Sequence, residues 1–217
     1  MRQRTATILI AATLLLAACT APAERAAMTV PYSPMLAGPE DGSLVDSIAV
    51  AAIEGGRETR PLSTSQVSNE DFQGALTDSL REHGLLAEGT APSYILSARL
   101  VDLRQPVLGL SMTVRAGVEY ELVDSVNGRP TLTRTVESSH TTAFTEAFGA
   151  DDRTRLATEG AIRENIRQFL AWLIRKPAPP PEAPARLSLW NSGGIRPVET
   201  PGSFRSGLLP VGGRPPS

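Results

Sequence analysis

Met112-Thr-Val-Arg-Ala-Gly-Val-Glu-Tyr-Glu-Leu122 is the stretch that decides the fold, because apolar residues occupy every second position along it. The positions between them include Arg115, Glu119 and Glu121. Side chains of a β-strand point alternately to the two faces of its sheet. The pattern therefore predicts a strand with one dry face and one wet face, in a sheet that is covered on one side.

A hairpin is predicted immediately after this strand. Asn127-Gly128 favours a tight turn, because both residues tolerate positive φ angles. The threonine-rich segment from Thr131 to about Thr142 would then return antiparallel to the first strand. Leu132 and Val136 would lie on its apolar side.

Two more strands and a helix are predicted upstream. Residues 94–103 alternate in part, and residues 48–53 form a continuous apolar run that is short enough for a buried strand. Between them, Ser68 is expected to cap a helix that ends at Gly84. One face of this helix would be apolar, formed by Phe72, Ala75, Leu76, Ser79 and Leu80.

A second helix is predicted downstream, capped by Asp151 or Asp152 and ending at Lys176 before Pro177. Glu159 and Arg163 are spaced for an i,i+4 ion pair. Glycine disfavours a helix, so Gly160 indicates a close contact between the helix and the sheet. The apolar stripe would contain Leu156, Ile162, Ile166, Phe169, Leu170 and Leu173.

The predicted element order is strand, helix, three strands, helix. This order predicts an α+β fold, a two-layer sandwich in which a four-stranded mixed/antiparallel sheet carries two helices on one face. The other face of the sheet would meet water or a partner, and it would present Thr113, Arg115, Glu119, Thr133 and Glu137.

The N-terminus has the pattern of an export signal. Arg2 and Arg4 precede an eleven-residue segment, Ile8 to Ala18, that is apolar apart from Thr13 and ends in Leu16-Ala17-Ala18-Cys19. A helix that crosses a bilayer needs roughly 20 apolar residues, so the segment fits a secretory signal. These residues resemble the signal peptide and cleavage box of bacterial lipoprotein precursors. The alternative is an ordinary signal peptide with an incidental cysteine.

The lipoprotein resemblance implies cleavage after residue 18 and acylation of Cys19, which would anchor the chain in a membrane. Two or more acyl chains hold a protein firmly, whereas one chain holds it only marginally. Thr20 stands where an aspartate would favour retention at the inner membrane. The resemblance therefore implies a lipid-anchored protein on the periplasmic face of the outer membrane.

Composition limits the remaining possibilities. Cleavage would remove Arg2 and Arg4 and change the formal charge from −2 to −4, which gives no electrostatic basis for binding nucleic acid. Cys19 is the only cysteine, so a disulfide within the chain is impossible. The predicted organisation is a signal peptide (1–18), a lipidated cysteine with a flexible tether (19–46), a folded domain (47–176) and a disordered Pro/Gly-rich tail (177–217). Residues 28–36 could instead pack on the domain as a strap.

The element order also resembles small lipoproteins of the Gram-negative envelope. The residues that carry this resemblance are Phe72-x-x-Ala75-Leu76-x-x-x-Leu80, Gly84-Leu85 and the alternating strand that starts at Tyr94. The families concerned are the lipopolysaccharide-assembly lipoprotein and the auxiliary lipoproteins of ABC-type lipid transport. The resemblance covers about residues 47–176, and no functional residue is transferred from either family.

Few residues suggest catalytic or metal chemistry. Ser138 and His140 would share one face of a strand, whereas Ser139 would face the other way, and no nucleophile elbow accompanies them. Asp151-Asp152 suits a helix start, and Gly55-Gly56 lacks the context of a phosphate-binding loop. His83 would lie at a helix end, and Trp172 would pack in or at the edge of the core or contact a partner. Trp190 lies in the tail, where the segment from Leu187 to Trp190 could instead be a short recognition segment.

These observations favour a non-enzymatic envelope lipoprotein that acts as an accessory or assembly factor by binding a protein or a lipid. The covalent lipid on Cys19 is the only attached group expected, and neither a catalytic nor a metal site is predicted. A lipid-binding transport component is the first alternative, and an envelope enzyme is the second.

Overall fold

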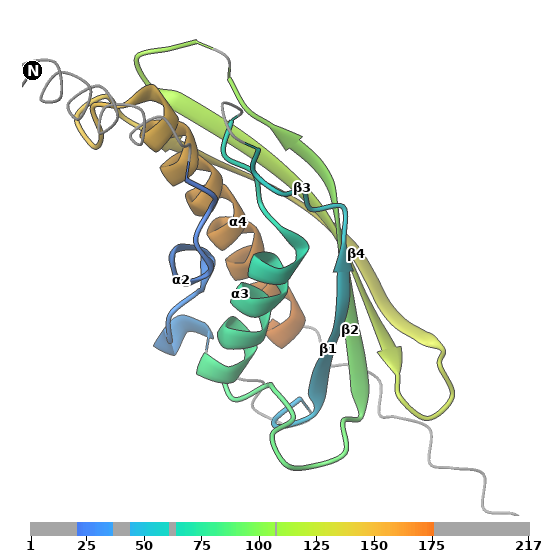
Figure 1. The fold of residues 1–217 in the computed structure, drawn as a ribbon. Helices are drawn as coiled ribbons and strands as arrows, with labels where there is room; N and C mark the ends of the chain where they lie inside the picture. The colour runs from blue at the N-terminus through green and yellow to red at the C-terminus, as the bar shows by residue number, and fades with distance from the viewer. Residues whose placement is uncertain (1–20, 37–43, 61–63, 107, 176–217) are drawn as a thin grey trace, which may run out of the picture. The chain divides into compact units, whose positions relative to one another are not determined.

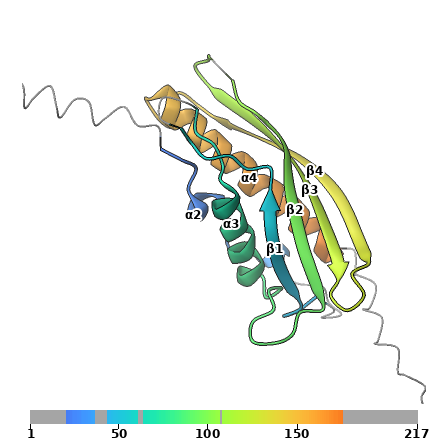
Figure 2. The same ribbon diagram turned by 45° about the vertical axis from the view of Figure 1, so that its right-hand side comes forward.

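The computed structural model describes residues 21–36, 44–60, 64–106 and 108–175. Four strands form one sheet in the order β1-β2-β3-β4, from β1 (Ile48–Glu54) through β2 (Tyr94–Arg104) and β3 (Met112–Asp124) to β4 (Pro130–Thr142). β1 pairs parallel to β2, and the other neighbours are antiparallel. Helices α3 (Asn69–Glu82) and α4 (Ala150–Arg175) lie on the same face of the sheet (Figures 1 and 2). The predicted α+β sandwich is confirmed.

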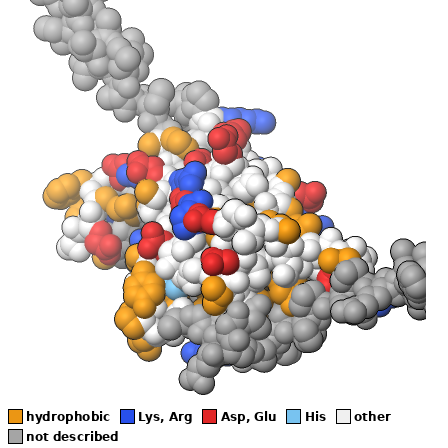
Figure 3. All heavy atoms as spheres, turned by 90° about the horizontal axis from the view of Figure 1, so that it is seen from below, with side chains coloured by type: hydrophobic (Ala, Val, Ile, Leu, Met, Phe, Trp, Pro, Cys, Tyr) orange, Lys and Arg blue, Asp and Glu red, His pale blue; other side chains and the backbone are white. Residues whose placement is uncertain are grey.

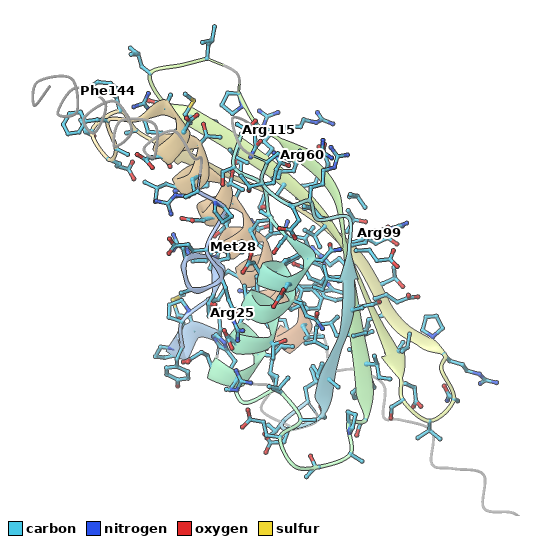
Figure 4. All side chains as sticks on the ribbon, in the orientation of Figure 1. Arg25, Met28, Arg60, Arg99, Arg115 and Phe144 are labelled. Atoms are coloured by element: carbon cyan, nitrogen blue, oxygen red, sulfur yellow. The ribbon has the colours of Figure 1, made fainter. Side chains whose placement is uncertain are left out.

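β3 has the predicted dry and wet faces. Its alternating residues from Met112 to Leu122 are all buried beneath the helices, whereas Thr113 and Arg115 are exposed on the outer face. The register pairs Leu96 with Leu122. Figure 4 labels Arg99 and Arg115, whose side chains extend from this outer face. The core therefore lies between the helices and one face of the sheet.

Helix α3 begins as predicted. The Asp71 N–H donates a hydrogen bond to the Ser68 hydroxyl oxygen at 3.0 Å, and the Ser68 hydroxyl donates to the Asp71 carboxylate at 2.6 Å. Gly84, with φ +65°, ends the helix. The five residues predicted for its apolar face are all buried.

The start of α4 differs from the prediction. The helix begins at Ala150, so Asp151 and Asp152 lie inside its first turn rather than at the cap. They are exposed there, where a negative charge favours the helix dipole. The Arg153 N–H donates to the Gly149 carbonyl, which shows that the chain turns helical just before the two aspartates.

The β3–β4 turn also differs from the predicted two-residue turn. Gly128 has a φ of +68°, but Asn127 does not share the left-handed conformation. The Asp124 carboxylate instead accepts hydrogen bonds from the N–H groups of Val126 and Asn127. An aspartate side chain that binds the following backbone builds a longer loop than glycine geometry alone would give.

Residues 21–36, which were assigned to the flexible tether, form a strap across α3 and α4 instead. The strap contains helix α2 (Arg25–Met28) and the 3-10 helix η2 (Pro34–Leu36). Met28, Val30 and Leu36 are buried in the core, and Figure 4 labels Met28. Apolar burial at about 25 cal/mol per Å² explains why this segment packs despite its weak periodicity. The alternative of a packed strap is the one that the structure shows.

Polar contacts hold the strap in place. Arg25 makes two hydrogen bonds to the Asp78 carboxylate of α3, at 2.5 and 2.6 Å. The buried Glu159 carboxylate of α4 accepts from the Glu24 N–H at 3.0 Å and pairs with Arg155 at 3.0 Å. The predicted Glu159–Arg163 ion pair is therefore wrong, because each of the two side chains bonds to the backbone of the strap. Glu159 accepts from Glu24, and Arg163 donates to the Ala27 carbonyl.

Seen from below in Figure 3, basic and acidic side chains are intermixed rather than separated by sign. The predictions for the signal peptide, Cys19 and residues 177–217, including Trp190, fall outside the described residues.

Candidate functional site

The Ser138-Ser139-His140 segment lies on β4, at an edge of the sheet. Ser138 and His140 face α4, as predicted, and Ser139 faces outward and is exposed. The Ser138 hydroxyl donates to the Ala161 carbonyl at 2.8 Å and accepts from the Asn165 amide at 3.1 Å. The Ser138 hydroxyl therefore joins β4 to α4 through both of these hydrogen bonds.

His140 packs against Gly160 of α4. A Cβ atom added to Gly160 would lie 2.2 Å from Cδ2 of His140, which confirms the close helix–sheet contact that the glycine indicated. The absent side chain leaves room for the imidazole beside the helix. This arrangement places a half-buried histidine at the edge of the sheet.

A groove of about 370 Å³ opens beside this contact, between the strap and α4. We call it the His140 groove. The strap supplies one wall, and α4 and β4 supply the other. The strap wall is formed by Val30, Pro31, Tyr32, Ser33 and Leu36, and the opposite wall by His140, Gly160, Arg163, Glu164 and Arg167. The volume is at the small end of the range for ligand pockets.

The rim of the His140 groove is charged. Glu164 accepts hydrogen bonds from Arg167 at 2.6 and 2.7 Å and from Gln168 at 2.8 Å. The Arg167 hydrogen bond is the main reason that the pKa of Glu164 lies below its ordinary value, so the carboxylate is ionised at neutral pH. With Arg163 beside this pair, the rim combines two arginines and one carboxylate around an apolar strap wall.

A second, polar hollow of about 640 Å³ is lined by residues of β2, β3, β4 and α4. Asp102 and Arg104 line it, and they form an ion pair at 2.7 Å. The two hollows share His140 and Glu164.

The other residues singled out from the sequence have structural roles. The His83 ring contacts the Ser79 carbonyl at 2.8 Å at the end of α3. Gly55, with φ +84°, lies against the Leu100 backbone, and the Gly56 N–H donates to Asn69. Trp172 is half-buried against Phe169, and Arg134 lies 4.9 Å from the centre of its ring.

Asn165 is a buried residue that sequence reasoning missed. Its side-chain amide donates to the Val136 carbonyl at 2.8 Å, and its oxygen accepts from the Tyr120 hydroxyl at 2.9 Å. The Tyr120 ring stacks on Phe169 with centroids 3.9 Å apart, and burial raises the pKa of its phenol. The sequence did contain a signal for this role: Asn165 is a polar residue three positions after Ile162, within the predicted apolar stripe of α4.

Within the described ranges, no group of three His, Cys, Asp or Glu side chains is placed to hold a metal ion. No helix in the described part of the chain has the length and apolarity needed to span a membrane.

No protein-family model matches the sequence, and no curated protein matches it. Solved structures with a similar arrangement include a DUF330 protein from Xanthomonas campestris, with a TM-score of 0.49 and 13% identity over 68% of this chain and 91% of that chain. Another is PelC from Paraburkholderia phytofirmans, solved as a dodecamer (TM-score 0.43, 19% identity, 64% and 94% covered). A third is a minor lipoprotein from Acinetobacter baumannii (TM-score 0.41, 16% identity, 63% and 96% covered).

Proposed function

We propose that this chain is a lipid-anchored, non-enzymatic accessory protein of the bacterial envelope, which acts by binding a partner protein at the outer membrane. Leu16-Ala17-Ala18-Cys19 after a basic start and an apolar segment supports the anchor, and Thr20 supports the outer membrane. The network of Ser138, Asn165 and Tyr120 supports a structural rather than a catalytic role for the serine beside His140.

The observation that carries the binding role is the His140 groove. It pairs an apolar wall from the strap with a rim that contains Arg163 and Arg167. Such a surface suits a partner segment that inserts one or two apolar side chains and places a polar or acidic group at the rim. The adjacent edge strand β4 offers backbone groups to an extended segment.

The test is capture of partners by the full-length lipoprotein in mild detergent, with mass spectrometry of the proteins and lipids that copurify. Arg163→Glu and Tyr32→Ala alter opposite walls of the groove at exposed side chains. Arg175→Glu is the matched control, since it makes the same charge change at an exposed position of the same helix, eight residues after Arg167.

We expect one or more stoichiometric envelope proteins with the wild type and with Arg175→Glu, and their loss with both groove variants. Equal capture by all four proteins would overturn the groove assignment. Copurified lipid without a protein partner would favour the alternative of a lipid-binding transport component.

A further inference from the structure

Large apolar side chains are exposed at one end of the sheet. Leu108 is 89% exposed and Leu110 is 76% exposed, both in the β2–β3 loop. Phe148 is 91% exposed and Phe144 is 46% exposed, both between β4 and α4. We call these four residues the apolar end. Soluble surfaces seldom gather such side chains without a binding role.

Strand pairing places the two loops at the same end. Met112, which begins β3, pairs with Thr142, which ends β4. Leu110 lies two residues before this pair, and Phe144 lies two residues after it. Figures 1 and 2 show both loops at the upper end of the fold, and Figure 4 labels Phe144 there.

The exposure of Phe148 is built into the fold. The buried Arg153 side chain donates to the carbonyls of Ala147 and Phe148 at 2.8 and 2.7 Å, and its guanidinium lies 5.1 Å from the centre of the Phe144 ring. These bonds turn the backbone polar groups inward. The Glu146 carboxylate accepts from the Ala143 N–H and closes the loop. The hydrogen bonds within the β4–α4 loop therefore hold the Phe148 side chain on the surface.

The described chain begins at this same end. The buried Ala23 donates its N–H to the Gln66 carbonyl, and the Gln66 side chain donates to Gln105 at 3.1 Å. Gln105 is three residues from Leu108 and is fixed to Thr158 of α4 by a hydrogen bond at 3.0 Å. Three residues separate Cys19 from Ala23, and the four Cα–Cα steps between them span no more than about 14 Å at full extension.

We propose that the apolar end docks on the lipid bilayer that holds Cys19, with Leu108, Leu110, Phe144 and Phe148 entering the interfacial layer. This inference rests on the proposed acylation of Cys19. The short reach from the anchor brings the membrane to this end, whereas the β3–β4 turn lies at the far end of 13-residue strands. The segment Gln105–Ser111 contains no charged residue, and the acidic groups of Glu146, Asp151 and Asp152 limit entry to the tips of the loops.

The test uses the full-length acylated protein in vesicles of phosphatidylethanolamine and phosphatidylglycerol. Leu108→Cys and Phe148→Cys variants carry an environment-sensitive fluorophore, since acylation blocks the thiol of Cys19. Val126→Cys is the matched control, because it is also an exposed apolar residue but lies in the β3–β4 turn. Quenchers attached to lipid chains report contact with the bilayer, and iodide reports contact with water.

We expect lipid-borne quenchers to reduce the emission of the labels at 108 and 148 by roughly half or more, and to leave the label at 126 nearly unchanged. Equal iodide access at all three positions would overturn the proposal. Labels protected from iodide but insensitive to lipid-borne quenchers would also overturn it, in favour of a protein contact. Flotation of the vesicles tests the anchor separately. Protein that fails to float with the vesicles contradicts acylation. Protein that floats, but whose labels at 108 and 148 are quenched by iodide, contradicts docking of the apolar end and leaves the anchor supported.

Discussion

At Gly160, one missing side chain sets the distance between α4 and β4. Alanine normally favours a helix over glycine by about 1 kcal/mol. Here its Cβ would meet the His140 ring, so we expect Gly160→Ala to lower the free energy of unfolding by about 1–2 kcal/mol despite that gain. Denaturant unfolding measures the change. In a His140→Ala background the same substitution should become neutral or stabilising, and an unchanged loss there would show that the imidazole is not the obstacle.

Asn165 joins the helix to two strands through polar groups that water cannot reach. Asn165→Ala would leave the Tyr120 hydroxyl and the Val136 carbonyl without this partner inside the core. An unsatisfied buried group costs about 1–3 kcal/mol, so we expect a loss of about 2–4 kcal/mol in unfolding free energy.

Tyr120→Phe is the control for the asparagine, because it removes one hydroxyl and keeps the stacked ring. Thermal and denaturant unfolding should show a loss of about 1 kcal/mol for this variant. If the two substitutions were equally mild, Asn165 would not organise the core.

The strap depends on an ion pair that responds to pH. The hydrogen bond from Arg25 is the main reason that the pKa of Asp78 lies below its ordinary value. A carboxylate with a lowered pKa stabilises the fold at neutral pH, and this contribution is lost as the pH falls through the folded-state pKa. We expect Asp78→Asn to reduce the free energy of unfolding by about 0.5–1 kcal/mol at pH 7, and the two proteins to converge as the pH falls through the lowered folded-state pKa of Asp78.

Unfolding of both proteins between pH 7 and pH 2.5 checks this expectation. Glu119→Gln is the matched control, because Glu119 pairs with Arg99 on the exposed outer face of the sheet, away from the strap. Limited proteolysis should cut the strap of Asp78→Asn faster than that of the control. A gap that persists in acid would show that Asp78 acts through packing rather than charge.

The regular elements could be predicted because their periodicity is local. Alternation identified β3, and Ser68 with its apolar face identified α3. The strap was assigned to the tether because Met28 and Val30 show no repeat, and their burial depends on residues of α3 and α4 that are distant in sequence. The i,i+4 spacing predicted an ion pair between Glu159 and Arg163, but both side chains bond to the backbone of the strap instead.

At the scale of the whole chain, we expect Cys19→Ala to separate anchoring from folding. The variant should leave the membrane fraction for the soluble periplasmic fraction, because acylation at this residue is the proposed attachment. Circular dichroism and unfolding of the soluble form should match those of the domain in the wild type, since the described fold begins after residue 20. A processed Cys19→Ala protein that stays in the membrane fraction would contradict lipid anchoring.

The His140 groove could not be predicted from the sequence, because three separated segments form it. Tyr32 comes from the strap, His140 from β4 and Arg163 from α4. The sequence did indicate that Gly160 marks a close contact and that Ser138 and His140 share a face. It did not indicate that the strap would form the opposite wall, which is the step that turns this contact into a groove.

The hydrogen bond between Glu24 and Glu159 joins positions 135 residues apart, so the strap cannot dock while the chain is still being synthesised through the sheet. The strap is synthesised before the sheet, whereas α4, which receives it, follows β4 in the chain. Until α4 has been synthesised, the Glu24 N–H lacks its partner in Glu159 and the Arg163 side chain is not available to the Ala27 carbonyl. We expect nascent chains stalled before residue 150 to be cut by protease between residues 21 and 36, and chains released at full length to resist. The strap can therefore complete its contacts with the fold only after α4 has been synthesised.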